Sequence, residues 1–388
     1  MAPARDYRLG PFDFARGWFV VANSCDISTT KPHNARYFGE DVVLFRGAGG
    51  KVGMVAAYCP HMGTHLGKSQ NSYLAKAGLN IQEDGIRCPF HGWRFGLDGI
   101  CNHIPYYSGA IPRAARIKAW HVEERYGIVF CWNDPEGLEP HFDLPTIPEW
   151  YDDAVVRWDG LHLLGDLPCH PIEIFDNNSD YAHLAYLHGS EVLSYENEID
   201  GVFYRQRQSS FITREDVGAE WARPPAFAAG DDPQQLHASA ARDLVEVSDS
   251  GIVKTTNAYY GVGMNVAQWS DPVAVQLIAT TPVDDGSCRV WQGAIVRSPD
   301  GVVDDAARSA AAMFNSGLNQ ALGVDDGEIW ANKRPATTIL QLPSDGPFGQ
   351  ARRWYSQFFN PRSEAAAIVD RVTGVYRIKG VAAFEAAN

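Results

Sequence analysis

The chain has 388 residues, of which 45% are hydrophobic and 21% charged, and its formal net charge is −14. This length predicts two or three domains, each with enough apolar residues for a core. The acidic balance argues against nucleic acid and anionic membrane surfaces as partners. No apolar run reaches the ~18–20 residues of a membrane span, and the N-terminus lacks the apolar core of a signal peptide. We therefore expect a cytoplasmic protein.

The N-terminal third predicts a small antiparallel β domain. Its short apolar runs are separated by glycine-rich turns and lack helical periodicity. The runs lie at residues 17–22, 42–45, 52–56, 99–105 and 127–132. Proline, glycine and asparagine then crowd the stretch after residue 132. We place a domain boundary there, which predicts domains at residues 1–134 and 135–388.

The second predicted domain mixes strands and helices. Strands are expected near residues 202–213, 252–260, 273–281 and 289–297, and helices near residues 172–188, 303–322 and 363–378. Residues 223–233 (RPPAFAAGDDP) are expected to form a mobile loop over a pocket mouth. The sequence therefore predicts an α+β fold, in which an antiparallel β domain precedes an α+β domain with a mixed or antiparallel sheet flanked by helices.

Two short motifs in the first domain carry metal-ligand residues. Cys59-Pro60-His61 and Cys88-Pro89-Phe90-His91 each combine one cysteine with one histidine. Each pair is short enough for one tight loop to direct both side chains at one point. Zinc sites usually keep like ligands together, as C-x₂₋₄-C and H-x₃₋₅-H. The mixed pairs instead suit a [2Fe–2S] cluster in which two cysteines hold one iron and two histidines hold the other.

The residues around these pairs, CPHMGTHLG and CPFHGWRFGLDG, resemble the Rieske motif. The separation between the pairs is longer than in most Rieske domains. We interpret residues 68–83 as a surface insertion, because loops absorb extra residues at small entropic cost. A structural zinc site is the alternative for the four ligands. The other five cysteines are expected to be reduced thiols, namely Cys25, Cys101, Cys131, Cys169 and Cys288.

A second motif, NNSDYAHLAYLHG at residues 177–189, lies in the C-terminal domain. His183 and His188 are five residues apart, about 140° around an ideal helix. They converge only if the helix distorts or ends between them, and Gly189 provides an ending. Asp180 and His183 are spaced to share one helix face. The spacing therefore predicts a pair of metal-binding histidines at a helix end.

Mononuclear iron(II) that activates oxygen takes two histidines and one carboxylate, and leaves adjacent positions open. The carboxylate must come from another part of the chain. Asp326, at the end of the predicted helix 303–322, is our choice, and Asp325 and Glu328 are the alternatives. Aromatic residues of this domain are candidates to line an apolar pocket, namely Tyr259, Tyr260, Trp269 and Trp330. Of these, Trp330 is expected near the iron because of its helical offset from Asp326.

In the order of its motifs, the chain resembles the oxygenase component of the Rieske non-haem iron oxygenases. The cluster pairs come first, N-x-x-D-x-x-H-x-x-x-x-H follows, and a late D-x-E-I-W completes the set. Within that family the chain is most similar to 3-ketosteroid 9α-hydroxylase oxygenases and the related sterol desaturases. The residues that carry this similarity are GICNHIPY at 99–106, DGEIWANK at 326–333 and DGPFGQARRWY at 345–355.

The resemblance implies a role for each motif residue. The implied cluster ligands are Cys59, His61, Cys88 and His91, and the implied iron ligands are His183, His188 and Asp326. Asn177 matches a residue near the iron. Asp180 matches a carboxylate that links an iron histidine to a cluster histidine of the neighbouring subunit. The resemblance also implies a head-to-tail homotrimer and a separate ferredoxin or flavin reductase that passes on electrons from NAD(P)H.

The sequence therefore predicts a terminal oxygenase that uses O₂ at a mononuclear non-haem iron to hydroxylate a small, apolar, steroid-like substrate. Desaturation, O- or N-demethylation and aromatic-ring hydroxylation are the alternatives within this class. A Rieske electron-transfer protein without oxygen chemistry is the alternative from another class. Such carriers are single domains of ~100 residues, and they have no use for the motif at residues 183–188.

Overall fold

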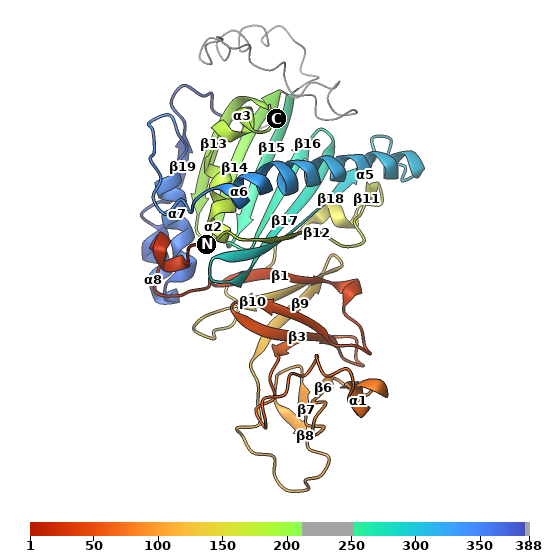
Figure 1. The fold of residues 1–388 in the computed structure, drawn as a ribbon. Coiled ribbons are helices and arrows are strands. Elements are labelled where there is room, and N and C mark those ends of the chain that lie inside the picture. The colour runs from red at the N-terminus through yellow and green to blue at the C-terminus, as the bar shows by residue number, and fades with distance from the viewer. Residues whose placement is uncertain (212–251, 385–388) are drawn as a thin grey trace.

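The computed structural model describes residues 1–211 and 252–384. In this part of the chain the strands form three sheets, and neighbouring strands pair antiparallel. The molecule is elongated, with the smallest sheet at one end and helix α3 (Ala182–Tyr186) towards the other (Figure 1). Residues 223–233, for which the sequence predicts a loop, lie outside the described residues.

Two sheets build the N-terminal half. One has the strand order β1-β10-β9-β4-β3-β2, and the smaller one has the order β5-β6-β7-β8. Their strands are β1 (Gly17–Asn23), β2 (His33–Tyr37), β3 (Glu40–Arg46), β4 (Val52–Ala56), β5 (Ile81–Gln82), β6 (Gly85–Arg87), β7 (Arg94–Gly96), β8 (Cys101–His103), β9 (Ala119–Arg125) and β10 (Ile128–Asn133). Strand β10 is buried along its whole length, as its apolar sequence predicts. The antiparallel β architecture expected for this half is confirmed.

The segment at residues 68–83 is largely exposed. It contains helix α1 (Tyr73–Lys76), which Ser72 caps by accepting a hydrogen bond from the N–H of Ala75. The Tyr73 side chain is 79% exposed. The segment therefore lies at the surface, as the sequence predicts.

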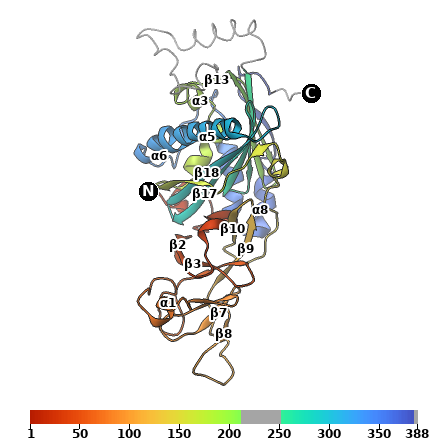
Figure 2. The same ribbon diagram turned by 90° about the vertical axis from the view of Figure 1, so that its right-hand side faces the viewer.

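The C-terminal half contains one large sheet with the order β11-β18-β17-β16-β15-β14-β13-β19, and β12 also pairs with β18. Its strands are β11 (Val155–Val156), β12 (His162–Leu167), β13 (Glu191–Asp200), β14 (Phe203–Phe211), β15 (Ile252–Tyr260), β16 (Met264–Ser270), β17 (Val273–Asp284), β18 (Ser287–Arg297) and β19 (Gly374–Arg377). Its helices are α2 (Pro171–Phe175), α3, α5 (Asp305–Asn319), α6 (Gly327–Asn332), α7 (Phe348–Ser356) and α8 (Arg362–Val369). Helices α5 and α6 lie across one face of this sheet (Figure 2), and the predicted α+β fold is confirmed.

The prediction of a helix over residues 363–378 is wrong in its second half. Helix α8 ends at Val369, and residues 374–377 form β19, which pairs with β13 at the edge of the large sheet. The edge strand of a sheet has backbone N–H and C=O groups without partners. A short segment that pairs with this strand forms hydrogen bonds with those groups. Strand β13 itself and helix α7 are further elements that the sequence analysis did not predict.

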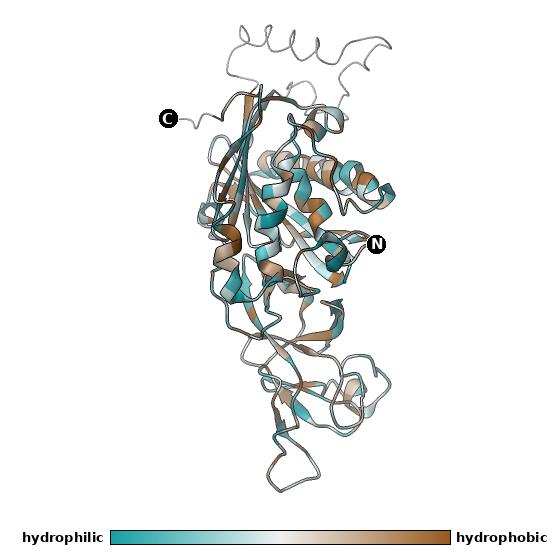
Figure 3. Cartoon of the chain, turned by 90° about the vertical axis from the view of Figure 1, so that its left-hand side faces the viewer, coloured by the Kyte–Doolittle hydropathy of each residue, from teal (hydrophilic) through white to brown (hydrophobic). Residues whose placement is uncertain are grey.

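A continuous hydrophobic core joins the two halves of the molecule. Trp18 and Phe19 of β1 belong to the same buried cluster as Met264 of β16 and Leu277 of β17. Hydrophobic residues run along strands in both halves (Figure 3). The approach is close, because a Cβ added at Gly263 would lie 2.2 Å from the Trp18 carbonyl oxygen. Within the described ranges, no helix is long and apolar enough to cross a membrane.

Candidate metal centres

Two loops in the N-terminal half carry Cys59 and Cys88, and they fold in the same way. In each loop the cysteine carbonyl accepts a hydrogen bond of 2.9 Å from the N–H of a glycine four residues on, Gly63 or Gly92. Each cysteine N–H donates in turn to the carbonyl five residues on. Gly63 and Gly92 have φ angles of 72° and 74°, a left-handed conformation that glycine adopts without a steric penalty. The glycines therefore give both loops the same tight turn.

The four predicted cluster ligands separate into two pairs. Cys59 and Cys88 are each 2% exposed, and a hydrogen bond between their thiols lowers the pKa of Cys88 to about 6. The rings of His61 and His91 lie 4.7 Å apart, and the His61 ring stacks on the indole of Trp93 at 4.6 Å. No three donor atoms of these four residues come within 4.8 Å of one another.

This separation decides between the two metals considered for the cysteine–histidine set. A single zinc ion needs its four ligands about 2.0–2.3 Å from one point, which would bring them closer together than they are. A cluster of two irons suits the arrangement, because two sulfurs then face one iron and two imidazoles face the other. The residues fit a Rieske cluster and do not fit zinc.

Residues 170–190 build the second candidate site from two short helices. Proline at position 171 begins α2, where its fixed φ suits the first turn. The Nδ1 atom of His170 accepts a hydrogen bond of 3.1 Å from the N–H of Ile172. Burial lowers the pKa of His170 to about 3, so the ring is neutral and available as an acceptor. A 3₁₀ turn follows α2, and Asp180 is extended before α3 begins, so the single helix predicted over residues 172–188 is interrupted.

His183 and His188 meet at the end of α3. The helix ends at Tyr186, and Gly189, with a φ of 66°, reverses the chain. The two imidazole rings consequently lie 5.4 Å apart. An uninterrupted helix would have separated them by about 140°. The convergence at a helix end is the arrangement that the five-residue spacing and Gly189 predict.

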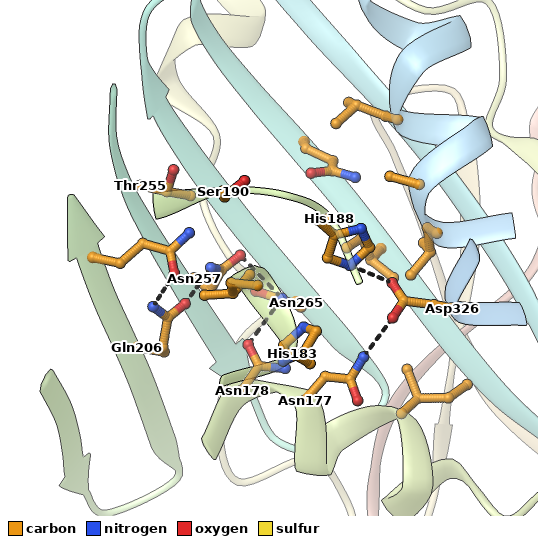
Figure 4. A pocket seen from close by; sticks show the side chains of 18 of the residues that line it. Asn177, Asn178, His183, His188, Ser190, Gln206, Thr255, Asn257, Asn265 and Asp326 are labelled. Carbon is orange, nitrogen blue, oxygen red and sulfur yellow. Dashed lines mark hydrogen bonds and ion pairs between the residues drawn. The ribbon is translucent and has the colours of Figure 1, made fainter. Parts of the chain in front are cut away.

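Asp326 reaches the same point from a distant part of the chain. Its Oδ2 atom lies 3.4 Å from Nε2 of His188, and its Oδ1 atom accepts a hydrogen bond of 2.9 Å from Nδ2 of Asn177 (Figure 4). The residue ends a π-helical turn, Gln320–Asp326, that joins α5 to α6. Such turns are rare and frequent at functional sites, because an extra residue changes the direction of a side chain. The sequence predicts Asp326 at the end of a helix. In the structure it lies inside a helical run that continues into α6.

The competing carboxylates do not join the group. Asp325 accepts a hydrogen bond of 3.1 Å from Gln320 in an exposed position, and Glu328 is exposed. In the described part of the chain, only His183, His188 and Asp326 form a set of three or more histidine, cysteine or acidic donors within 4.8 Å.

This donor set fits a mononuclear iron(II) ion. Burial lowers the pKa of His183 below its ordinary value and outweighs the opposing effect of Asp326, so the ring is neutral and presents a lone pair. The side chains of His183, His188 and Asp326 are 16%, 11% and 9% exposed. Two imidazoles and one carboxylate grouped in a sheltered position are the ligands that such an iron prefers.

Asp180 lies beside this group but not on helix α3, so the predicted shared helix face is wrong. Its Oδ1 atom accepts hydrogen bonds from the N–H groups of Ala182 and His183, at 3.1 and 3.3 Å. Its main-chain carbonyl lies 2.5 Å from Nδ1 of His183. A carbonyl only accepts, so Nδ1 carries the proton and Nε2 of His183 remains free to bind a metal.

The donor set opens into a cavity between the large sheet and the α5–α6 run. About 1050 Å³ of space, part of it open to solvent, separates its walls. Trp330 lines the cavity, as predicted, and so do Tyr259 and Trp269. Tyr260 is not among the lining residues, and its ring packs against Phe203 at 5.2 Å.

Amide side chains on β14 also line the cavity, and the sequence analysis missed them. Gln206 and Gln208 point into it, whereas Arg205 and Arg207, on alternate positions, form ion pairs on the other face. Charged side chains are rarely buried without a partner. The alternation of arginine with glutamine is therefore a signal that the uncharged amide face is the inner one.

The chain matches two families. Residues 17–119 match the Rieske [2Fe–2S] domain, and residues 131–359 match the C-terminal domain of 3-ketosteroid 9α-hydroxylase. The oxygenase component of a 3-ketosteroid-9-alpha-monooxygenase from Rhodococcus rhodochrous is 32% identical over 363 residues, which span 91% of this chain and 86% of the relative. A cholesterol 7-desaturase from Caenorhabditis elegans is 26% identical over 90% of this chain and 78% of its own length.

A solved structure shows the same fold at lower identity. Dicamba monooxygenase bound to dicamba has a TM-score of 0.59 and 20% sequence identity to this chain, and the match covers 90% of this chain and 98% of that one. The resemblance to 3-ketosteroid 9α-hydroxylase oxygenases that the motifs indicate is confirmed, because the match to the C-terminal domain alone spans more than half of the chain. The chain therefore belongs to the family of 3-ketosteroid 9α-hydroxylase oxygenase components, which are Rieske oxygenases.

Proposed function

We propose that this oxygenase component uses O₂ and electrons from a separate reductase to hydroxylate a steroid-like substrate at an iron held by His183, His188 and Asp326. One observation carries the proposal: the three donors line the same large cavity, so a molecule bound there lies against them. Concave sites with a few polar groups among apolar side chains are where proteins commonly bind small organic molecules. The steroid ring system is supported by the similarity to the 3-ketosteroid-9-alpha-monooxygenase from Rhodococcus rhodochrous.

The chain itself prepares the iron-binding face. Iron(II) held by His183, His188 and Asp326 would supply the O₂ chemistry. Asn177 acts as a positioning residue, because its amide holds one oxygen of the Asp326 carboxylate. The Asp180 carbonyl fixes the His183 tautomer. Trp330, 3% exposed, shields one side of the cavity from water.

The cluster ligands are proposed to be Cys59, Cys88, His61 and His91. The sulfur end of this site is buried, whereas His61 lies at the surface. Its neighbours Met62 and Phe90 are 64% and 58% exposed. The imidazole end is therefore the end that a redox partner or a second copy of the chain can approach. A ferredoxin or flavin reductase that draws electrons from NAD(P)H completes the proposed system.

The two centres lie towards opposite ends of the elongated chain (Figures 1 and 2). Strands β6 and β7 flank the second cluster loop at one end, and α3 carries His183 towards the other. We propose a head-to-tail homotrimer in which the cluster of one copy lies beside Asp180 of the next. The Asp180 side chain is 38% exposed, which leaves its carboxylate accessible to a neighbouring histidine.

Mixed trimers test this arrangement. The Cys59→Ser variant removes a cluster ligand and the Asp326→Ala variant removes an iron ligand, so each variant alone is expected to be inactive. Co-expressed, the two variants are expected to recover about a quarter of wild-type turnover, because random mixing places an intact cluster beside an intact iron site at one junction in four.

Metal analysis of the mixed sample provides the control. Iron and acid-labile sulfide confirm that each variant keeps the centre that was not altered. A mixed sample that contains both centres and shows no turnover contradicts electron transfer between copies. If either variant is active when it is expressed alone, the assignment of the altered residue as a metal ligand is contradicted.

Desaturation is the second candidate, favoured by the similarity to the cholesterol 7-desaturase. Hydroxylation and desaturation both begin at a C–H bond held near the iron, so the donor set does not separate them. A substrate screen with a surrogate reductase, with oxygen uptake measured, identifies the substrate. Mass analysis after a reaction in isotopically labelled O₂ then distinguishes them, since only hydroxylation transfers the label to the product.

A further inference from the structure

The cavity beside the iron-binding group has two chemically different walls. Strands β14 to β17 present polar, uncharged side chains on one face of the sheet, among them Gln206, Asn257, Asn265 and Gln276. The α5–α6 run presents apolar side chains on the opposite side, namely Leu318, Ala321, Leu322 and Trp330. A purely apolar substrate matches only the second of these walls.

The amides of the polar wall form a hydrogen-bonded row across neighbouring strands (Figure 4). Asn265 donates through Nδ2 to Asn257, at 3.4 Å, and Asn257 donates to Gln206, at 2.5 Å. Gln206 donates in turn to Gln208, at 3.1 Å. The Nδ2 atom of Asn265 also lies 3.5 Å from Oδ1 of Asn178. Turning the Asn265 amide over by itself would break both of its donor bonds, so the row favours the orientation in which Nδ2 donates.

Three polar atoms in the cavity lining are buried without a hydrogen-bond partner in the described part of the chain. They are Oδ1 of Asn265, Oγ of Ser210 and Nε1 of Trp269. Asn265 and Ser210 are each 3% exposed. Buried polar groups cost free energy unless they are paired, so these atoms point to a ligand with complementary groups.

The character of the unpaired atoms identifies those groups. Oδ1 of Asn265 only accepts, Nε1 of Trp269 only donates, and the Ser210 hydroxyl does both. A ketone accepts but never donates, so a steroid whose only oxygens are ketones leaves Asn265 unpaired. A hydroxyl group both donates and accepts, so it is chemically able to pair with each of the three atoms.

We infer that the substrate of this oxygenase is a hydroxylated steroid-type molecule, with its hydroxyl groups on the edge or face that meets the amide wall and its apolar face against α5 and α6. Asn265 and Ser210 are the specificity-determining residues. This inference rests on the proposed function and specifies the substrate class of the same site.

Binding measurements under anaerobic conditions, without reductase, test this inference on the intact holoprotein, because no turnover occurs. Intrinsic tryptophan fluorescence reports binding, since Trp269 and Trp330 line the cavity. The probes are 4-androstene-3,17-dione and its 7α-, 11β- and 12α-hydroxy derivatives. At least one hydroxylated probe is expected to bind about tenfold or more tightly than the dione, with kcat/KM for turnover in the same order.

Substitutions then assign the preference to the wall. Asn265→Leu is expected to abolish the preference for the hydroxylated probe while keeping dione binding. Ser210→Ala, a smaller change that the fold tolerates more readily, is expected to reduce the preference. Ser209→Ala is the matched control, because Ser209 lies on the other face of β14 and pairs with Ser194 at 2.5 Å. It is expected to leave the ratio of the two dissociation constants unchanged.

The outcomes separate this inference from the proposed function. If the dione binds as tightly as every hydroxylated probe, or if neither Asn265→Leu nor Ser210→Ala changes the ratio, the polar atoms are met by water and the inference fails. In that case, steroid-dependent oxygen uptake would still support the proposed function. If no steroid binds and none stimulates oxygen uptake, both fail together.

Discussion

The two metal centres of this chain are built in opposite ways. The proposed cluster site draws its four ligands from two similar loops within residues 59–91, and each loop is held by its own glycine and backbone hydrogen bonds. The proposed iron site takes two histidines from the end of α3 and its carboxylate from the distant α5–α6 run. The first is a product of local turns, whereas the second exists only when distant elements pack together.

This difference has consequences for how each centre responds to change. A substitution in the cluster loops is expected to act on the cluster alone. A change anywhere in the packing of α2, α3 and the α5–α6 run is expected to displace one iron ligand from the others. The iron centre should therefore be the more vulnerable of the two, and the cluster should serve as an internal control in each experiment.

The largest expected effect comes from Asp326→Ala. Iron is expected to fall from about three to about two atoms per chain, with sulfide and the visible absorption of the cluster unchanged. Turnover should be lost, because two imidazoles alone do not complete the set that iron(II) prefers. Asp325→Ala is the matched control and should retain three irons. If Asp325→Ala empties the site and Asp326→Ala does not, the carboxylate is assigned to the wrong residue.

Asp180→Asn separates electron transfer from metal binding. Asparagine keeps the oxygen that caps α3 and the main-chain carbonyl that holds His183, so both metals should remain. Turnover is expected to fall about 100-fold or more, because the residue next to an iron ligand loses its charge. Re-oxidation of the pre-reduced cluster by O₂ and substrate should slow by the same factor. Normal re-oxidation would remove the bridging role from Asp180.

How far the sequence predicts the iron centre depends on which residue is considered. The convergence of His183 and His188 follows from a five-residue spacing and one glycine, which are local features. The choice of Asp326 over Asp325 does not follow from spacing, because it depends on a π-helical turn set by packing against the sheet. The hydrogen bond from Asn177 to Asp326 cannot be predicted from the sequence either, because it joins residues that only the packing of distant elements brings together.

The fold shows a similar division between local and distant causes. Strands β14 and β15 are visible in the sequence because their side chains alternate, and β17 and β18 because apolar residues dominate them. Residues 374–377 form a strand by pairing with the edge of β13. No pattern in the sequence near these residues indicates that this edge is available. The amide row of the cavity was missed because a polar face normally meets solvent, and the covering helices lie far along the chain.

Gly346→Ala tests whether packing around α3 selectively weakens the iron centre. A Cβ at this position would lie 1.6 Å from the main-chain oxygen of Ser179, so the backbone next to Asp180 must move. Stability is expected to fall by roughly 1–3 kcal/mol, with reduced iron affinity and unchanged cluster absorption. Gly349→Ala is the control, since its nearest atom is 4.0 Å away. Equal loss of cluster and iron would contradict the contrast between the centres.

His170→Asn probes the pH dependence of the half that carries the iron site. Burial lowers the pKa of His170 to about 3, so between that value and about 6.5 the unfolded chain binds a proton that the folded chain does not. The histidine's contribution is therefore complete above pH 6.5 and is lost as the pH falls, by about 0.7 kcal/mol between pH 7 and pH 6.

Asparagine retains an acceptor that caps α2 but does not titrate. The free energy of unfolding of the variant should therefore lack the decrease that His170 causes between pH 7 and pH 6, whatever the variant's absolute stability. Urea unfolding at several pH values measures the slope. His33 and His141, whose pKa values burial also lowers, titrate in both proteins and cancel in the comparison. Identical slopes for the two proteins would show that His170 binds its proton equally well in the folded and the unfolded chain, and that its ring does not cap α2 as an acceptor.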